Sequence, residues 1–324
     1  MKDVTAGIDI GGIDSEIGIA SEDGTLNERD KIITTNFPDV NDFIRECYHM
    51  ITKLSSGYNL KGIGVAAPNG NPYTGAIENA VNLAWKGVIP FVELTKRYTS
   101  LPVVLTNDAK AAAVGEKIFG GARNMDNFIL VTLGTGLGSG IYTHGHLLTG
   151  HLGLAGEMGH TIVEDDGRMC NTKRKGCLEA YASVTGIRRT VLALLSGSVL
   201  NSPLRGLSFE ALDGHQIFLA ARNGDPIALE AFQYTGKVLG RALANAASVF
   251  DPEAIFIAGG LAHAGDLILG PTEKYFNENV FPAFEGKVKL LISELMDENG
   301  GVLGACALAW DKHRQQETPS MRIS

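Results

Sequence analysis

The chain has 324 residues, of which 44% are apolar and 20% charged, a balance that is typical of globular proteins and excludes wholesale disorder. Its 28 basic and 36 acidic residues give a formal charge of −8, and Lys173-Arg174-Lys175 is the densest basic cluster, so we expect no nucleic-acid partner. No apolar stretch approaches the roughly 18 residues of a membrane span. The N-terminus has no signal-peptide core, and four cysteines make no disulfide framework. These features predict a cytoplasmic protein with no membrane partner, long enough for two domains.

The first third of the chain predicts alternating strands and helices. Apolar alternation over residues 4–21 indicates two strands around a pair of glycines. A helix is expected over 42–54, where apolar residues share one face, and a short buried strand over 63–67. Residues 103–106 predict a further strand, and an Ala-rich helix follows over 107–118. This alternation indicates the α/β class with short crossovers.

Residues 128–144 repeat the first pattern of strand, glycine turn and strand, which suggests two related halves. A glycine-rich segment follows over 156–179. The remaining expected elements are helices over 178–195, 228–250 and 302–312 and strands over 254–258 and 288–293. The α/β class therefore extends over the whole chain.

Three glycine turns, each after a buried strand, are candidate phosphate sites. They contain Gly11 and Gly12; Gly134, Thr135 and Gly136; and Gly259 and Gly260. Glycine lets the backbone N–H groups approach phosphate oxygens, and Asp9 beside the first turn suits a Mg²⁺ ion held through waters. Any one of these turns alone is more simply a hairpin turn. Three in one chain favour a nucleotide site, although neither a P-loop nor a dinucleotide-binding motif is present.

Asn107 and Asp108 lie between a predicted strand and a predicted helix. An Asp at such a place is commonly a helix cap. The carboxyl end of a strand in an α/β sheet is also where ligands bind, and a helix N-terminus favours an ionised carboxylate. An ionised Asp108 could accept a hydroxyl proton during phosphoryl transfer. Both interpretations stay open on spacing alone.

His160, Cys170 and Cys177 offer three of the four ligands that a structural zinc ion takes. Thr172 occupies the position at which a Cys-x-Cys pair would have its second sulfur. A metal-free group of buried, reduced side chains is the alternative interpretation.

Five ordered motifs together resemble the ROK family (repressors, open reading frames and kinases), and most of all its bacterial glucokinases. They are Asp9-Ile10-Gly11-Gly12, Leu105-Thr106-Asn107-Asp108-Ala109, Leu133-Gly134-Thr135-Gly136, Gly156-Glu157-Met158-Gly159-His160 and Gly176-Cys177-Leu178-Glu179. The resemblance runs from Gly7 to about Trp310. It implies a two-lobed, actin-like ATPase (ribonuclease H-like) fold with a ligand cleft between the lobes. The expected lobes are 1–106 plus 300–324, and 107–299 with the sugar site, the zinc-type loop and an oligomer surface.

The resemblance also implies an ATP- and Mg²⁺-dependent hexose kinase, with glucose as the expected substrate and Asp108 as the base that takes the proton from the 6-hydroxyl. The implied sugar-binding residues are Asn82, Asn107, Asp108, Glu157, His160 and Glu179. The implied contacts to ATP and Mg²⁺ are Asp9, Gly11, Gly12, Gly134, Thr135, Gly136, Gly259 and Gly260. His160, Cys170 and Cys177 match zinc ligands, and relatives suggest a homodimer or homotetramer.

Two positions depart from the family pattern. Ile13 replaces a Thr whose hydroxyl could donate to a phosphate oxygen, a loss of about 1 kcal/mol in ATP binding. Thr172 replaces a zinc-ligating Cys, so zinc is either absent or bound more weakly with water as the fourth ligand.

Three alternatives remain beside a glucose kinase. N-acetylmannosamine, fructose or allose could be the substrate, and polyphosphate could be the donor. A sugar-binding regulatory protein without ATP turnover would also fit Ile13 and Thr172. A repressor with a DNA-binding domain is not expected, because the first glycine turn already follows residue 9.

Overall fold

The computed structural model describes residues 1–295 and 300–317, which form two compact α/β units. The first unit contains Met1–Met125, Leu147–Ala155 and helix α8 (Gly300–Glu317). The second contains Asp126–His146 and residues 156–295. Each unit is built around one five-stranded sheet.

The first sheet has the strand order β3-β2-β1-β4-β8. Its strands are β1 (Asp3–Ile10), β2 (Ser15–Ser21), β3 (Leu26–Ile32), β4 (Asn59–Ala66) and β8 (Val103–Thr106). Strands β1, β2 and β3 pair antiparallel, whereas β1, β4 and β8 run parallel. The carboxyl ends of these three parallel strands therefore lie at one edge of the sheet.

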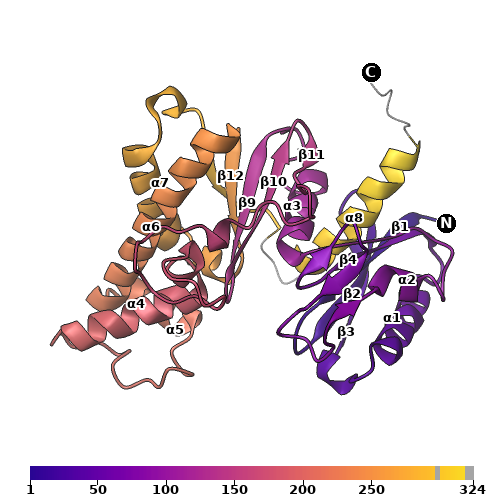
Figure 1. The fold of residues 1–324 in the computed structure, drawn as a ribbon, viewed down its shortest axis with the longest axis horizontal. Coiled ribbons are helices and arrows are strands. Elements are labelled where there is room, and N and C mark those ends of the chain that lie inside the picture. Colours follow the sequence, from indigo (N-terminus) through magenta and orange to yellow (C-terminus); the bar gives the residue numbers. More distant parts are fainter. Residues whose placement is uncertain (296–299, 318–324) are drawn as a thin grey trace. The chain divides into compact units, whose positions relative to one another are not determined.

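Helices cover both faces of this sheet (Figure 1). Alternate β1 residues, from Val4 to Ile10, pack in one core with α1 (Val40–Leu54). The residues between them face α8, because Thr5 Oγ1 donates to the Cys306 carbonyl. A Cβ atom added to Gly64 would lie 1.9 Å from the Ala305 carbonyl oxygen, so this glycine lets α8 lie directly on the strands. Helix α3 (Asp108–Ile118) packs against α8 on the same face.

Short elements complete the first unit. A three-stranded sheet, β5 (Gly70–Asn71), β6 (Ala76–Glu78) and β7 (Val88–Ile89), lies between β4 and β8 in the sequence and is followed by α2 (Phe91–Thr95). A 3-10 turn, η1 (Thr34–Asn36), precedes α1. The sequence did not predict β3, this small sheet or α2, because β3 is polar and the other elements have five residues or fewer.

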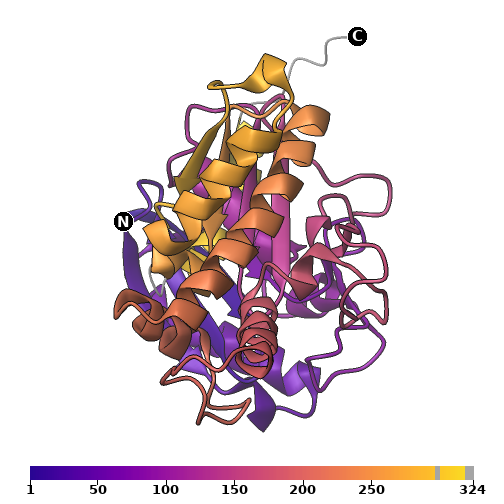
Figure 2. The ribbon, with the colours of Figure 1, turned by 90° about the vertical axis from the view of Figure 1, so that its left-hand side faces the viewer.

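The second sheet has the order β11-β10-β9-β12-β13. Its strands are β9 (Phe128–Leu133), β10 (Leu137–Thr143), β11 (His146–Leu147), β12 (Ala254–Ala258) and β13 (Lys289–Ile292). The helices are α4 (Val184–Gly197), α5 (Gly214–Arg222), α6 (Pro226–Phe250) and α7 (Asp266–Asn279), with 3-10 turns η2 (Met158–His160), η3 (Leu178–Ala180), η4 (Gly260–Ala264) and η5 (Pro282–Phe284). Helices α6 and α7 pack side by side, as Figure 2 shows.

The two sheets share one topology: an antiparallel three-strand meander, followed by two strands parallel to its first strand. This match confirms the predicted repeat of two related halves. The compact units differ from the predicted lobes, 1–106 plus 300–324 and 107–299, in two places. Residues 107–125 belong to the first unit, because α3 packs on α8, and so does the segment Leu147–Ala155. The expected helix over 178–195 is divided into η3 and α4, since Ser183 caps α4 through the Gly186 N–H.

Within residues 1–295 and 300–317, no helix has both the length and the apolar character needed to cross a membrane. All four cysteines are buried free thiols.

Candidate active site

Two candidate acidic residues meet at the carboxyl edge of the first sheet. Asp9 near the end of β1 and Thr106 at the end of β8 both pair with Ala66 of the strand between them. Asp108 follows two residues after Thr106, at the first position of α3. The parallel register therefore places the two carboxylates near each other.

The two carboxylates have different surroundings. Burial, and after it the nearby charge of Asp108, raise the pKa of Asp9 to about 7. Asp108 is exposed, and its Oδ1 accepts a hydrogen bond from the Ala109 N–H at 2.8 Å. Asn107 caps α3, because its Oδ1 accepts from the Lys110 N–H at 2.8 Å. Asp108 can therefore meet a ligand from solvent, whereas Asp9 favours a nearby cation that would keep it ionised.

The first glycine turn lies against the loop that holds Asn82. A Cβ atom at Gly12 would be 2.7 Å from the Asn82 carbonyl oxygen, so a side chain there would push this loop away. Ile13, next in the turn, is 74% exposed. The structure thus brings Asn82 to the glycine turn and directs Ile13 to solvent.

The other two glycine turns lie at the carboxyl edge of the second sheet. Strands β9 and β12 are parallel, with Ala258 opposite Thr132, so the turns that follow them are neighbours. Gly259 has φ +86°, and a Cβ atom there would lie 2.8 Å from the Leu133 nitrogen. Positive φ and this close approach both favour glycine at position 259.

Glu179 lies directly on the second glycine turn. Its Oε2 accepts a hydrogen bond from the Leu137 N–H at 3.3 Å, and a Cβ atom at Gly136 would be 2.3 Å from the same oxygen. Its Oε1 is buried and has no hydrogen-bond partner within the described chain. Buried carboxylate oxygens are normally paired, so Oε1 is free to accept from a ligand hydroxyl.

The segment with Glu157 and His160 is docked on β10. The Ser139 hydroxyl donates to the Gly156 carbonyl, and a Cβ atom at Gly159 would lie 2.2 Å from the Leu137 carbonyl oxygen. Glu157 itself is exposed, with Oε2 4.0 Å from His160 Nε2. Glu157 and His160 therefore share a fixed segment of the second unit.

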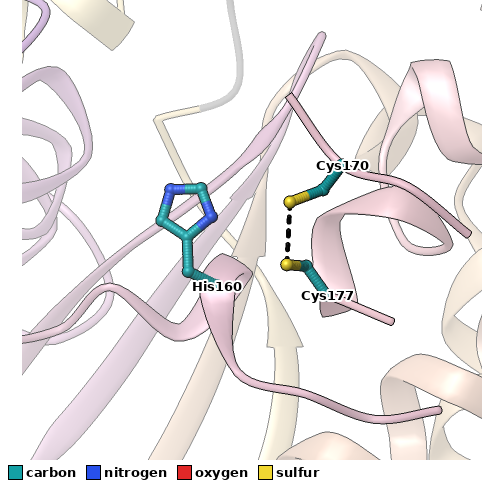
Figure 3. A group of neighbouring side chains, drawn as sticks. All are labelled: His160, Cys170 and Cys177. Carbon is teal, nitrogen blue, oxygen red and sulfur yellow. Dashed lines mark hydrogen bonds between the residues drawn. The ribbon is translucent and has the colours of Figure 1, made fainter. Parts of the chain in front are cut away.

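His160, Cys170 and Cys177 form one cluster (Figure 3). Their ligand atoms all lie within 4.8 Å of one another, and the two sulfurs are 2.8 Å apart. His160 Nδ1 is buried without a hydrogen-bond partner among the described residues. The Thr172 hydroxyl lies 2.9 Å from the Cys170 sulfur. This donor set fits a metal with three strong protein ligands and a weak fourth position.

The sequence predicted the glycine turns, the carboxylates and the His/Cys cluster. The structure places Asp9 and Asp108 at one sheet edge, the second and third glycine turns at the other, and His160, Cys170 and Cys177 in one cluster. Lys110 was missed. It is fully buried two residues beyond Asp108, although its neighbours in α3 are mostly alanines. The sequence feature that could have identified Lys110 is a charged residue within a predicted helix whose other residues are mostly small and apolar.

Comparisons with known proteins agree with this arrangement. A model of the ROK family matches residues 5–312. A glucokinase from Thermotoga maritima is 38% identical over 309 residues, covering 93% of this chain and 96% of that protein. A ROK family glucokinase from Streptomyces griseus, solved with glucose and AMPPNP, has a TM-score of 0.80 at 32% identity and covers 95% of this chain and 99% of that one. The xylose repressor of Bacillus subtilis is 29% identical and covers 95% of this chain and 77% of that protein.

Proposed function

Because the chain belongs to the ROK family and has its two-lobed, actin-like ATPase fold, we propose that it is an ATP-dependent kinase that phosphorylates the 6-hydroxyl of glucose. The observation that carries this proposal is the pair Asp9 and Asp108 at the carboxyl edge of the first sheet, one half-buried with a raised pKa and one exposed and open to a ligand. Glucokinases at 32–38% identity over nearly the whole chain support glucose as the acceptor.

Asp108 acts as the base in this proposal. Its carboxylate accepts the proton of the 6-hydroxyl while the sugar oxygen bonds to the γ-phosphorus and the bond from that phosphorus to the ADP oxygen breaks. The sugar is held by Asn82, Asn107, Glu157, His160 and Glu179. The unpaired Oε1 of Glu179 supports this role, because a sugar hydroxyl would satisfy it.

The glycine turns bind ATP, with backbone N–H groups of the turns at Gly11, Gly134 and Gly259 donating to its phosphates and nucleoside. Mg²⁺ supplies charge neutralisation on the phosphates when it is bound. Asp9 would hold this ion, and the Asp9 carboxylate, whose pKa is raised to about 7, would stay ionised at neutral pH beside the positive charge.

Zinc is proposed as a structural ion held by His160, Cys170 and Cys177. It would fix the loop between the two cysteines next to His160, and it takes no part in the phosphoryl transfer. The Thr172 hydroxyl, which lies 2.9 Å from the Cys170 sulfur, or a water would take the fourth position, so we expect weaker binding than in a four-ligand site. Measuring bound zinc against a chelator should show a T172C variant retaining the ion at chelator concentrations that strip the wild type. Equal retention would contradict this assignment.

We also propose that the protein is a cytoplasmic homo-oligomer. The cytoplasm supplies the ATP that the reaction consumes. Sedimentation analysis of the purified chain tests the oligomeric state, and a single monomeric species would contradict it.

The decisive test is ADP release from MgATP with a panel of hexoses, followed by identification of the phosphorylated position. We expect glucose to give the largest kcat/KM and glucose 6-phosphate as product. The matched control is 6-deoxyglucose, which keeps the other hydroxyls and should bind without turnover. If N-acetylmannosamine, fructose or allose is phosphorylated faster than glucose, that sugar is the substrate instead. Repeating the assay with polyphosphate in place of ATP tests the phosphoryl donor.

A sugar-binding regulatory protein is the second candidate, favoured by the exposed Ile13 in the first glycine turn. It predicts that glucose binds by calorimetry while no hexose releases ADP. The two candidates therefore differ in one measurement on the same sample.

A further inference from the structure

A cavity of about 400 Å³ lies along β8, which is an edge strand of the first sheet. All four residues of β8, Val103–Thr106, line this cavity, together with residues of α8, of α2 and of the turn between β5 and β6. Every lining residue belongs to the first unit. Among the described residues that line it, none is a proposed contact to sugar, ATP or zinc. The cavity is therefore a feature of the first unit alone and is separate from the proposed active site.

The cavity has the size and part of the lining that a small-molecule site needs. Pockets that hold small molecules usually have volumes of about 300–1,000 Å³ and walls that are largely apolar. Val92 of α2, Val104 of β8 and Leu308 of α8 all line the cavity and are only half-buried. Their remaining apolar surface would be removed from water by the body of a bound molecule, which favours binding.

Thr106 supplies a polar atom that has no partner. Its side chain is 1% exposed, and its Oγ1 is buried without a hydrogen-bond partner within residues 1–295 and 300–317. Buried hydroxyl groups are normally paired, and a hydroxyl can both donate and accept. Because Thr106 also lines the cavity, a polar atom of a bound molecule would supply the missing hydrogen bond. This hydroxyl distinguishes the cavity from a purely apolar groove.

The charged residues of the cavity favour an anion. Lys96, the C-cap of α2, and Lys312 of α8 both line it, and both are exposed. Within the described chain, neither ammonium group has an ion pair or a hydrogen bond. Asp311 is the one lining carboxylate in that part of the chain, and its Oδ2 already accepts from Gln315 Nε2 at 2.8 Å. Two positive charges and one negative charge leave the lining positive, although the whole chain carries −8.

We propose that this cavity is a binding site for a small organic anion. Lys96 and Lys312 hold its acidic group, which is a carboxylate or a phosphate ester. Its apolar body lies against Val92, Val104 and Leu308, and a hydroxyl or carbonyl group on that body bonds to Thr106 Oγ1. The proposal does not depend on the kinase function, because the lining contains no residue assigned to that reaction.

The first test measures the binding of two aromatic anions, benzoate and phenyl phosphate, to the full chain by calorimetry. Saturating MgADP is present, so that neither anion can occupy the proposed nucleotide site. Benzyl alcohol, which has the ring without the charge, is the neutral control. We expect at least one anion to bind with a Kd about tenfold lower than that of benzyl alcohol, as two ionic contacts imply. The tighter anion identifies the acidic group as carboxylate or phosphate.

The lysines are tested with the double variant K96M/K312M. This variant should raise the Kd of the tighter anion about tenfold and leave that of benzyl alcohol unchanged. K53M is the matched control, because Lys53 is also an exposed lysine in the last turn of a helix, α1, but does not line the cavity. Its Kd should equal that of the wild type. Absence of anion binding to the wild type, or equal binding by K96M/K312M, would overturn the proposal.

A second variant tests the buried hydroxyl independently. In the wild type, the better of 3-hydroxybenzoate and 4-hydroxybenzoate should bind about fivefold more tightly than benzoate, the effect of one added hydrogen bond. T106V removes the hydroxyl while keeping the shape of the side chain, so this advantage should disappear and the Kd of benzoate itself should stay constant. An advantage that persists in T106V would show that Thr106 does not face the ligand and would contradict the site as described.

Discussion

The two sheets share one strand order but present different chemistry at their carboxyl edges. The edge of the first sheet carries carboxylates, Asp9 and Asp108. The edge of the second sheet carries the turns after β9 and β12, which are mostly glycine, and Glu179 reaches this edge from η3. The parallel strands differ as well, since β1 and β4 contain glycines at 7, 62 and 64, whereas their counterparts β9 and β12 contain none.

This difference shows how two sheets with the same topology can carry different functional groups. Carboxylates suit proton transfer and a hydrated Mg²⁺ ion, so the first half is suited to the reacting groups. Glycine turns present backbone N–H groups, so the second half is suited to an anionic nucleotide. The same topology thus supplies two carboxylates and one glycine turn at the first edge, and two glycine turns at the second.

The largest expected effect comes from removing the proposed base. Asp108→Asn keeps the size of the side chain and its place at the start of α3, so glucose should still bind. The kcat should fall by about a thousandfold, because an amide cannot take the hydroxyl proton. Calorimetry with glucose and steady-state ADP release measure the two quantities. Substantial turnover in this variant would mean that the first sheet does not carry the base.

The next effect concerns stability and the glycines of the first sheet. Gly64→Ala places a Cβ atom 1.9 Å from the Ala305 carbonyl oxygen, so α8 must move. We expect the free energy of unfolding to fall by about 2 kcal/mol or more, measured in urea. Gly197→Ala is the control, since a Cβ atom there meets nothing within 4 Å of the described chain. This control should leave the free energy unchanged or raise it by at most about 1 kcal/mol.

A smaller effect is expected from pH, through Asp9. Its pKa of about 7 means that the carboxyl gains a proton, and loses its attraction for Mg²⁺, as the pH falls through 7. The ionised fraction of such a group falls about tenfold from pH 8 to pH 6, so the affinity for MgATP should fall by a similar factor. Asp9→Asn should bind MgATP weakly at both pH values. A wild-type affinity independent of pH would contradict the role of Asp9.

The same shift gives a stability prediction with a defined sign. The unfolded chain loses the Asp9 proton near pH 4, whereas the folded chain keeps it until about pH 7. The folded state therefore binds more protons between these values, and this contribution to stability falls as the pH rises across the window. In the absence of Mg²⁺, Asp9→Asn should gain stability relative to the wild type from pH 4.5 to pH 8 in urea unfolding.

The smallest expected effect is a gain. Ile13→Thr restores a hydroxyl in the first glycine turn, where the side chain is exposed and has room to change. A new hydrogen bond to phosphate of about 1 kcal/mol would lower the KM for ATP about fivefold. The KM for glucose should stay constant, which separates this change from a general improvement in folding. No change in the KM for ATP would show that residue 13 does not reach the nucleotide.

Much of this organisation was predictable from local pattern. Alternating apolar residues predicted the strands around the glycine turns, and β8 begins and ends at the predicted residues. The motif at Asn107 and Asp108 predicted both a cap and a candidate base, and the cap hydrogen bond is present. These features depend on neighbours in the sequence, so the sequence is enough to find them.

Long-range contacts were harder to predict. The carbonyl that Lys110 reaches lies 43 residues away, and no local pattern encodes that contact. Glu179 Oε1 is buried and has no hydrogen-bond partner among the described residues, and this likewise depends on the packing of η3 against a distant turn. From the sequence alone, Gly64 could lie in a turn or in a strand against which a helix packs, because glycine suits both places.

The position of α8 also has a consequence for the order in which the protein is made. The final helix lies on β1, β2 and β4, and its Cys306 contacts Thr5 and Gly18 near the opposite end of the chain. During synthesis the N-terminal strands leave the ribosome first, and this face of their sheet lacks α8 until that helix has been made. A prematurely terminated chain would therefore expose a sheet surface of small residues. Cellular quality control could recognise that surface before an incomplete enzyme accumulates.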